Sequence, residues 1–155
     1  MCAKATRLTK QKKAILDDLR SRKDHPTANI LFDNLRYVLP NISIATIYRN
    51  LDSLEQSGEV LRICPPSGVW RFDGDTSSHY HLCCVGCDRV FDLPDSFSLS
   101  VNFDADSVPG AIIEGYRLDF LGLCQDCNSQ GVKPERVSSC LFDGQTKAVI
   151  DLLTN

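Results

Sequence analysis

The stretch ISIATIYRNLDSLEQSGEVLRICPPSGVWRFDG, residues 42–74, changes from a helical to a strand-like pattern within one short segment. Apolar residues recur at steps of three and four across 44–58, which predicts a helix with Ser43 as its N-cap. The positions concerned are Ile44, Ile47, Leu51 and Leu54. After this helix, the segments 59–64 and 69–74 predict two strands, because the PPSG between them has the composition of a hairpin turn.

Two further helices are predicted upstream of this stretch. Thr9 can cap a helix over 10–23 and Thr27 a helix over 28–39, with Pro26 between them, because the residue before a proline avoids the helical backbone. The apolar stripe expected on the second helix consists of Ile30, Leu31, Leu35 and Val38. Three helices followed by a β-hairpin predict a winged helix-turn-helix.

Downstream of the hairpin, the small polar segment GDTSS predicts a hinge. Strand-like segments then follow at 79–84, 89–93 and 111–123. The last residues, 143–155, predict a short helix. We therefore expect an α+β protein that consists of a winged helix-turn-helix domain at 1–73, a hinge at 74–78 and a small α/β domain at 79–155.

The two halves of the chain carry opposite charge. Residues 1–72 hold 12 Lys and Arg against 7 Asp and Glu, a net charge of +5. Residues 73–155 hold 5 Lys and Arg against 13 Asp and Glu, a net charge of -8. This asymmetry indicates two modules, the first of which faces a polyanion, although two ordinary solvated surfaces would give the same counts.

The composition limits the class of protein. The chain has 155 residues, of which 43% are hydrophobic and 24% charged, as in ordinary globular proteins. No apolar run approaches the roughly 18 residues of a membrane helix, and the basic N-terminus has no apolar segment of a secretory signal behind it. We therefore expect a cytoplasmic protein with no membrane association. In such a protein, eight cysteines indicate metal binding rather than disulfides.

Two C-x-x-C pairs, Cys84 with Cys87 and Cys124 with Cys127, predict one metal site. A two-residue spacer turns both thiolates of a pair towards the same ion, and two pairs complete a tetrahedral sulfur shell that suits Zn²⁺. Such a closed shell predicts a structural role. The alternatives are an iron centre of the rubredoxin kind, a redox C-x-x-C and four buried reduced cysteines. Cys83 should point to the opposite face of its strand.

A second cluster of possible ligands surrounds the motif HYH. His79 and His81 are two residues apart, so on a strand they share one face and can hold one ion. Asp73 and Asp92 could add oxygen ligands, although two half-exposed histidines on a strand would give the same motif. A zinc deaminase would require H-x-E, which this chain lacks. An electron carrier with an iron–sulfur centre is the other competing class.

The order of HPTA, ISIATIYRNLDSLEQSG, RFDGDTSSHYHLCCVGC and YRLDFLGLCQDC resembles that of the ferric uptake regulator superfamily, and in particular its peroxide-responsive branch. The resemblance covers roughly residues 5 to 128. It implies a cytoplasmic, metal-dependent transcriptional repressor rather than an enzyme, with the second domain forming a homodimer. It also implies one structural Zn²⁺ per chain on the four paired cysteines.

The resemblance further implies one regulatory Fe²⁺ or Mn²⁺ per chain. The matching ligands are His25, Asp73, His79, His81 and Asp92. In the branch concerned, iron-catalysed oxidation of a ligand histidine releases the ion and ends repression, and the candidates here are His25 and His79. The alternative is a repressor that responds to iron, manganese or zinc without sensing peroxide. Ser78, Tyr80 and Tyr116 replace ligands of a further site in the superfamily, so we expect a single regulatory ion.

The resemblance also implies that the third helix enters the major groove of a palindromic, A/T-rich operator. A tyrosine can contact a thymine methyl group, and an arginine can bond a guanine or a phosphate. Basic residues on the first helical segment can contact the phosphate backbone. The residues expected to contact DNA are Lys13, Thr46, Tyr48, Arg49 and Asn50.

Overall fold

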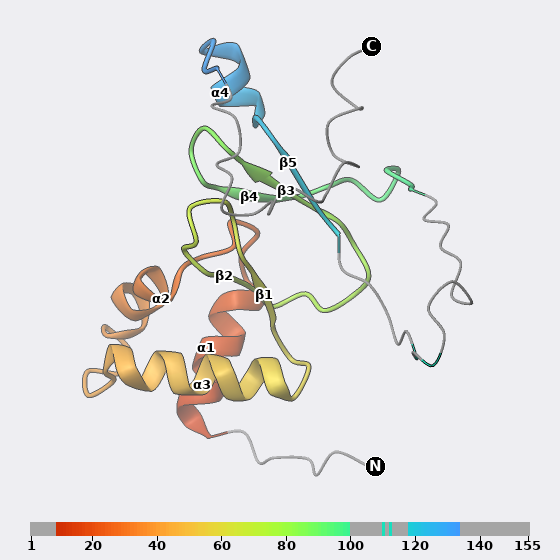
Figure 1. Ribbon diagram of the computed structural model, residues 1–155. Coiled ribbons are helices and arrows are strands. Elements are labelled where there is room, and N and C mark those ends of the chain that lie inside the picture. Colours follow the sequence, from red (N-terminus) through yellow and green to blue (C-terminus); the bar gives the residue numbers. More distant parts are fainter. Residues whose placement is uncertain (1–8, 100–109, 111, 113–117, 134–155) are drawn as a thin grey trace.

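The computed structural model describes residues 9–99, 110, 112 and 118–133. Three helices lie at one end of the molecule and a three-stranded sheet at the other, with a β-hairpin between them (Figure 1). The helices are α1 (Lys10–Arg20), α2 (Ala28–Leu35) and α3 (Ile44–Gln56). Within these described ranges, no helix is both long and apolar enough to cross a membrane.

The three helices begin where the sequence predicts. Thr9, Thr27 and Ser43 each have extended backbone, and each side chain accepts a hydrogen bond from the backbone N–H three residues further on. These bonds satisfy N–H groups that have no partner inside the helix. The helix starts are therefore set by local chemistry.

The expected apolar stripe of α2 is partly wrong. Leu31 and Leu35 are buried, but Ile30 is 37% exposed and Val38 is 68% exposed. The helix ends at Leu35, and the turn that follows carries Val38 away from the core. The helix was also expected to reach residue 39, so the predicted length of α2 is wrong as well.

One apolar core holds the helices and the hairpin together. It contains Ile15, Leu16, Leu19, Ala28, Leu31, Leu35, Ile42, Ile47, Leu51, Leu54, Val60 and Phe72. The hairpin consists of β1 (Leu61–Ile63) and β2 (Arg71–Asp73), which pair antiparallel. Burial of this apolar surface fixes α3 across the other two helices, as expected for a winged helix-turn-helix.

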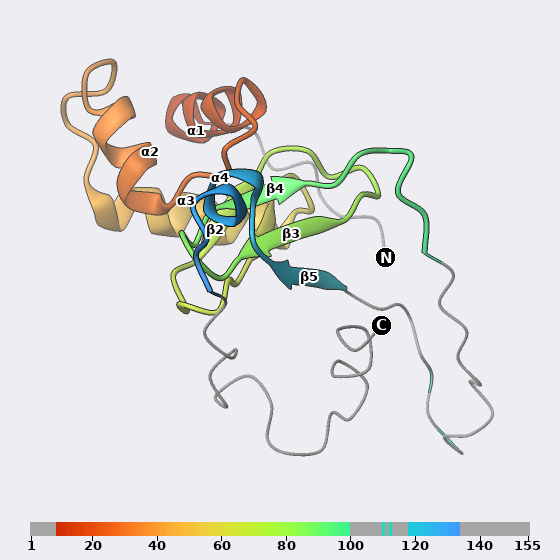
Figure 2. The ribbon, with the colours of Figure 1, turned by 90° about the horizontal axis from the view of Figure 1, so that it is seen from above.

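A mixed sheet forms the second part of the molecule (Figure 2). Its strands are β3 (His81–Cys84), β4 (Val90–Asp92) and β5 (Asp119–Gly122), in the order β4-β3-β5. β3 pairs antiparallel with β4 and parallel with β5. The short helix α4 (Gln125–Ser129) follows β5 and was not predicted. Most of the expected strand before Asp119 and the expected helix at 143–155 lie outside the described residues.

The hairpin belongs to both cores. Phe72 packs with the helices, whereas Ile63 is fully buried in a separate cluster with Cys83 and Val90 of the second sheet. Leu121 of β5 packs against the same cluster. Cys83 therefore points away from the other cysteines, as its place on the strand predicts. The hairpin is the packed connection between the two parts of the molecule.

Replacing Ile63 by alanine should lower the free energy of unfolding by about 2–5 kcal/mol, because the cavity would open where the hairpin meets the second sheet. Val69, in the same hairpin, is 49% exposed, so Val69→Ala should change stability by no more than about 0.5 kcal/mol. Urea denaturation followed by circular dichroism measures both. Equal midpoints for the two variants would contradict the shared packing.

Candidate metal centres

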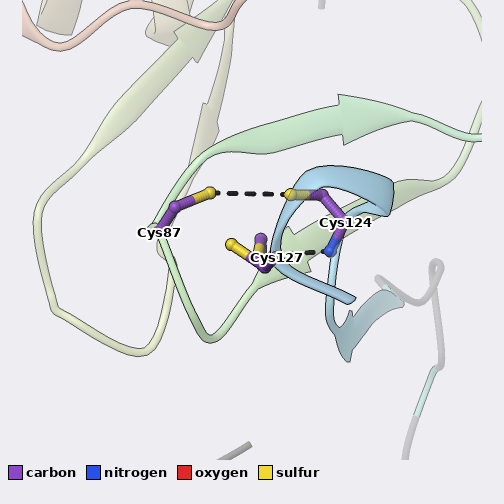
Figure 3. A group of neighbouring side chains, drawn as sticks. Cys87, Cys124 and Cys127 are labelled. Atoms are coloured by element: carbon purple, nitrogen blue, oxygen red, sulfur yellow. Dashed lines mark hydrogen bonds between the residues drawn. The ribbon is translucent and has the colours of Figure 1, made fainter. Parts of the chain in front are cut away.

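Four cysteines from two distant segments meet beside the second sheet. Cys84 ends β3 and Cys87 lies in the turn after it, whereas Cys124 and Cys127 lie at the start of α4. Their sulfur atoms all lie within 4.8 Å of one another. Figure 3 shows the sulfur atoms of Cys87 and Cys124 facing each other, 3.8 Å apart. Both C-x-x-C pairs therefore contribute to one cluster, as the spacing predicts.

The turn between β3 and β4 shapes the first pair. The backbone N–H of Cys84 donates to the carbonyl of Arg89 at 2.8 Å, and that of Asp88 donates to the carbonyl of Cys84 at 2.9 Å. Asp88 has a φ of 59°, a left-handed conformation that aspartate tolerates well. A Cβ at Gly86 would lie 3.1 Å from the sulfur of Cys127, so any other residue there would require the second pair to shift.

The surroundings shift the pKa values of two of these thiols in opposite directions. Burial and the three neighbouring cysteines raise the pKa of Cys127 to about 12, whereas the pKa of Cys84 falls. Burial opposes ionisation of Cys84, but backbone N–H groups, above all that of Cys124, outweigh burial and lower its pKa to about 6. The N–H of Cys124 lies 3.3 Å from the sulfur of Cys84. Four sulfurs this close cannot all be ionised without a cation among them. Four converging, largely buried thiol groups fit a tetrahedral Zn²⁺.

A second cluster gathers all three histidines of the chain. It consists of His25, Asp73, His79, His81 and Asp92, each of which offers one ligand atom within 4.8 Å of the others. The three rings are close neighbours, with centroids 5.1 Å apart for His25 and His81 and 4.5 Å for His79 and His81. The structure thus brings together every residue expected in the regulatory site.

The Nε2 atoms of the three rings converge on two carboxylate oxygens. From Oδ2 of Asp73 they lie at 3.5 Å for His25, 3.0 Å for His79 and 3.2 Å for His81. From Oδ1 of Asp92 they lie at 2.8, 3.4 and 3.8 Å in the same order. Five donor atoms therefore surround one point.

This arrangement fits a metal ion better than a set of hydrogen bonds. Nδ1 and Nε2 of His25 and Oδ1 of Asp92 are buried and lack a hydrogen-bond partner among the described residues. Nε2 of His25 and Oδ1 of Asp92 are 2.8 Å apart, but they are not oriented to bond each other. Buried polar atoms are normally satisfied, and an ion between these two would satisfy both.

The backbone holds His25 in the cluster. Its φ is 46°, an uncommon conformation for a residue other than glycine. Arg71 of β2 donates to the carbonyl of His25 at 3.2 Å, and the N–H of Phe72 donates to the carbonyl of Pro26 at 3.0 Å. The segment between α1 and α2 is thereby bound to the strand that ends at Asp73.

Several supporting groups were not predicted from the sequence. The carbonyl of Ser77 lies 3.0 Å from Nδ1 of His79, and a carboxylate oxygen of Asp119 lies 3.7 Å from Nδ1 of His81. Such partners turn the opposite ring nitrogen towards a metal. Lys23 lies 3.3 Å from carboxylates of both Asp75 and Asp92. Asp119 could have been predicted only from the strand register, which pairs it with His81.

Two ionisable groups of this cluster, His81 and Asp73, have strongly shifted pKa values. Burial opposes protonation of His81, but Asp119 and Asp73 outweigh burial and raise its pKa to about 9. Burial also opposes ionisation of Asp73, but the nearby His25 and His81 outweigh it and hold the pKa of Asp73 far below its usual range. A carboxylate and a protonated imidazole are thus paired in the site. A metal ligand must be deprotonated, so an entering ion displaces this proton.

The exposed face of α3 carries two of the residues expected to contact DNA. Tyr48 is 45% exposed and Arg49 is also exposed, whereas Thr46 and Asn50 are half-buried. Asn50 donates its side-chain amide to the carbonyl of Thr46 at 2.8 Å, and Arg49 donates to the hydroxyl of Thr46 at 3.2 Å. Lys13 is exposed on α1.

Comparison with known proteins shows the family. Residues 3–103 match the model of the "Ferric uptake regulator family". The chain is 36% identical over 124 residues to the "Peroxide operon regulator" of Bacillus subtilis (strain 168), covering 80% of this chain and 86% of that protein. It is 34% identical over 125 residues to the "Peroxide-responsive repressor PerR" of Staphylococcus epidermidis, covering 81% and 83%.

Solved structures show the same fold. The Campylobacter jejuni peroxide stress regulator aligns with a TM-score of 0.60 at 24% identity, covering 76% of this chain and 88% of that one. The Helicobacter pylori ferric uptake regulator aligns with a TM-score of 0.60 at 17% identity, covering 77% and 81%. With both donor clusters and this fold in place, the chain belongs to the ferric uptake regulator family of metal-dependent transcription regulators, which bind operator DNA as dimers.

Proposed function

We propose that the protein is a repressor whose affinity for its operator depends on a regulatory metal ion held by the histidine and aspartate cluster. The observation that carries this proposal is that the five ligands come from separate segments of the chain. His25 lies between α1 and α2, Asp73 ends β2, and His79, His81 and Asp92 lie in or beside the second sheet. An ion held by all five favours the arrangement that brings these segments together.

The role of the other cluster is structural. Four cysteine ligands fill the tetrahedral shell of Zn²⁺ and leave no position for a substrate. Cys84 ends β3 and Cys87 lies in the turn after it, whereas Cys124 caps α4 and Cys127 lies within it, so zinc would fasten these segments together. In this proposal one Zn²⁺ per chain holds the second domain, which forms the homodimer. We keep the domain boundaries expected from the sequence, in which residues 1–73 bind DNA and residues 74–78 form the hinge.

The DNA-binding surface is the exposed side of α3. We place Tyr48 and Arg49 against the base edges of a palindromic, A/T-rich operator, because both side chains extend from the helix. Thr46 and Asn50 support them, since Thr46 accepts the hydrogen bond of Arg49. Lys13 on α1 would contact a phosphate and add affinity without reading sequence.

The signal in this proposal is peroxide. The two curated relatives described above are peroxide regulators by name, and the carboxylate at position 92 is an aspartate. When bound, Fe²⁺ would activate hydrogen peroxide by lending it one electron, which the oxidised ring returns, so that the two electrons consumed come from the ring. The rings of all three histidines lie against the ligand point, and the resemblance to the peroxide-responsive branch favours His25 and His79 as the oxidised residues. Transfer of one oxygen atom, with loss of one water molecule from peroxide, converts such a ring to 2-oxo-histidine, a poorer ligand.

The zinc assignment predicts that Cys84→Ser or Cys124→Ser releases the metal and destabilises the second domain, because the free energy of structural zinc binding is part of the free energy of folding. Cys64→Ser is the control, since Cys64 lies outside the cluster. Atomic emission measures zinc in the purified proteins, and thermal unfolding measures stability. Full zinc content in Cys84→Ser would rule out this site.

The regulatory assignment predicts that Mn²⁺ strengthens operator binding about 5- to 150-fold, the usual range of allosteric coupling. Asp92→Ala should remove this effect while zinc stays bound, whereas Asp95→Ala, at an exposed position on the same segment, should keep it. Fluorescence anisotropy with labelled operator DNA gives the affinities. Tight, specific binding by zinc-containing protein after removal of the second metal would argue against the switch.

Peroxide sensing predicts that brief exposure of the iron-loaded protein to low hydrogen peroxide adds the mass of one oxygen atom to the peptide holding His25 or His79. Operator binding should fall in parallel. The manganese-loaded protein should keep both its mass and its affinity. Peptide mass spectrometry and anisotropy follow the two effects. Unmodified histidines and unchanged DNA binding would leave a repressor that responds to iron, manganese or zinc.

A further inference from the structure

Arg89 lies against the four-cysteine cluster without being one of its ligands. Its Nε donates to the sulfur of Cys87 at 3.3 Å, and its Nη2 lies 3.7 Å from the sulfur of Cys124. Its backbone carbonyl accepts the N–H of Cys84, so the same residue closes the turn that carries the first C-x-x-C pair. Arg89 therefore contacts both pairs of cysteines.

Other groups hold this guanidinium in place. Nη2 also donates to a carboxylate oxygen of Asp126 on α4 at 2.7 Å. The guanidinium carbon lies 5.2 Å from the centre of the Phe91 ring. Asp126 and Phe91 thus hold the planar group on two sides, and its N–H groups are left pointing at sulfur. Asp126, Cys87 and Cys124 together raise the pKa of Arg89, so the positive charge is permanent.

Arg89 covers the more accessible side of the cluster. Cys84, Cys124 and Cys127 are buried, whereas Cys87 is only partly buried. Cys87 receives the shorter of the two contacts from Arg89. A thiolate that accepts a charge-assisted hydrogen bond is stabilised, and its nucleophilicity falls with its basicity. The accessible sulfur is therefore the one that Arg89 approaches most closely.

We propose that Arg89 is a positioning residue that protects the four-cysteine site, slowing the attack of hydrogen peroxide on its thiolates and the loss of zinc that follows. This inference rests on the proposed function, since it takes zinc as the metal and peroxide as the oxidant. In the reaction that is slowed, two thiolates and one hydrogen peroxide give one disulfide and two hydroxide ions. The zinc ion that the thiolates held is then released.

This protection would separate the two metal sites by reactivity. At the histidine and aspartate cluster the arginine contact is to a backbone, since Arg71 donates to the carbonyl of His25, whereas Arg89 lies against two sulfurs of the cysteine cluster. A dose of peroxide that reaches both sites then acts at the histidines first. The fold keeps its zinc while the signal is received.

The test uses full-length protein loaded with zinc and Mn²⁺, so that no iron chemistry takes part. Zinc release during exposure to hydrogen peroxide is followed with a zinc-responsive dye, and disulfides are counted by mass spectrometry. Arg89→Gln should release zinc about tenfold faster than the wild type, in the range seen when partners of metal ligands are removed. Arg89→Lys keeps the charge but cannot donate hydrogen bonds to two sulfurs at once, so its rate of zinc release should be intermediate.

Arg20→Gln is the matched control, because Arg20 also pairs with an exposed carboxylate, that of Glu59, but lies on α1 far from the cysteines in the sequence. It should release zinc at the wild-type rate. If Arg89→Gln and Arg89→Lys both match the wild type, the inference is wrong while the zinc assignment stands. Wild-type protein that contains no zinc would instead overturn the zinc assignment itself.

Discussion

Two carboxylates held close together in a largely buried site are the constraint on which the arrangement depends. Asp73 and Asp92 place their oxygens in a group of five donor atoms that spans no more than 4.8 Å, and like charges so close require a compensating cation. Among the described residues, Lys23 and the protonated His81 supply part of that charge. A divalent ion would supply it more completely, because it also satisfies the unpaired Nε2 of His25.

The same electrostatic requirement connects local chemistry to long-range structure. Each carboxylate is placed by a different segment, since Asp73 ends β2 and Asp92 ends β4. Any cation that compensates both therefore stabilises the approach of the hairpin to the second sheet. The free energy available for this is the difference between the ion's affinities for the assembled and separated ligands, and tight binding to both would shift nothing.

Local sequence chemistry predicted the parts of the structure that depend on neighbouring residues. The caps Thr9, Thr27 and Ser43 and both C-x-x-C pairs are of this kind, and all of the expected ligand residues came together. The strand expected over 79–84 is shorter than predicted, because β3 begins at His81 and His79 lies before it. What the sequence did not predict depends on tertiary contacts. Periodicity did not show that α2 ends before Val38, which leaves that side chain exposed, or that the helix α4 forms. It also did not encode the strand register that places Asp119 beside His81.

The hairpin packs in both apolar clusters, and this limits how the molecule can change shape. Because Phe72 packs with the helices and Ile63 with the second sheet, rotation at the proposed hinge, residues 74–78, also acts on the hairpin. Such rotation must twist the hairpin, whose ladder is only three residue pairs long. Two-stranded ribbons tolerate more twist than wider sheets. The resistance of the hairpin to further twist therefore limits the angles that α3 and the second sheet can adopt relative to each other.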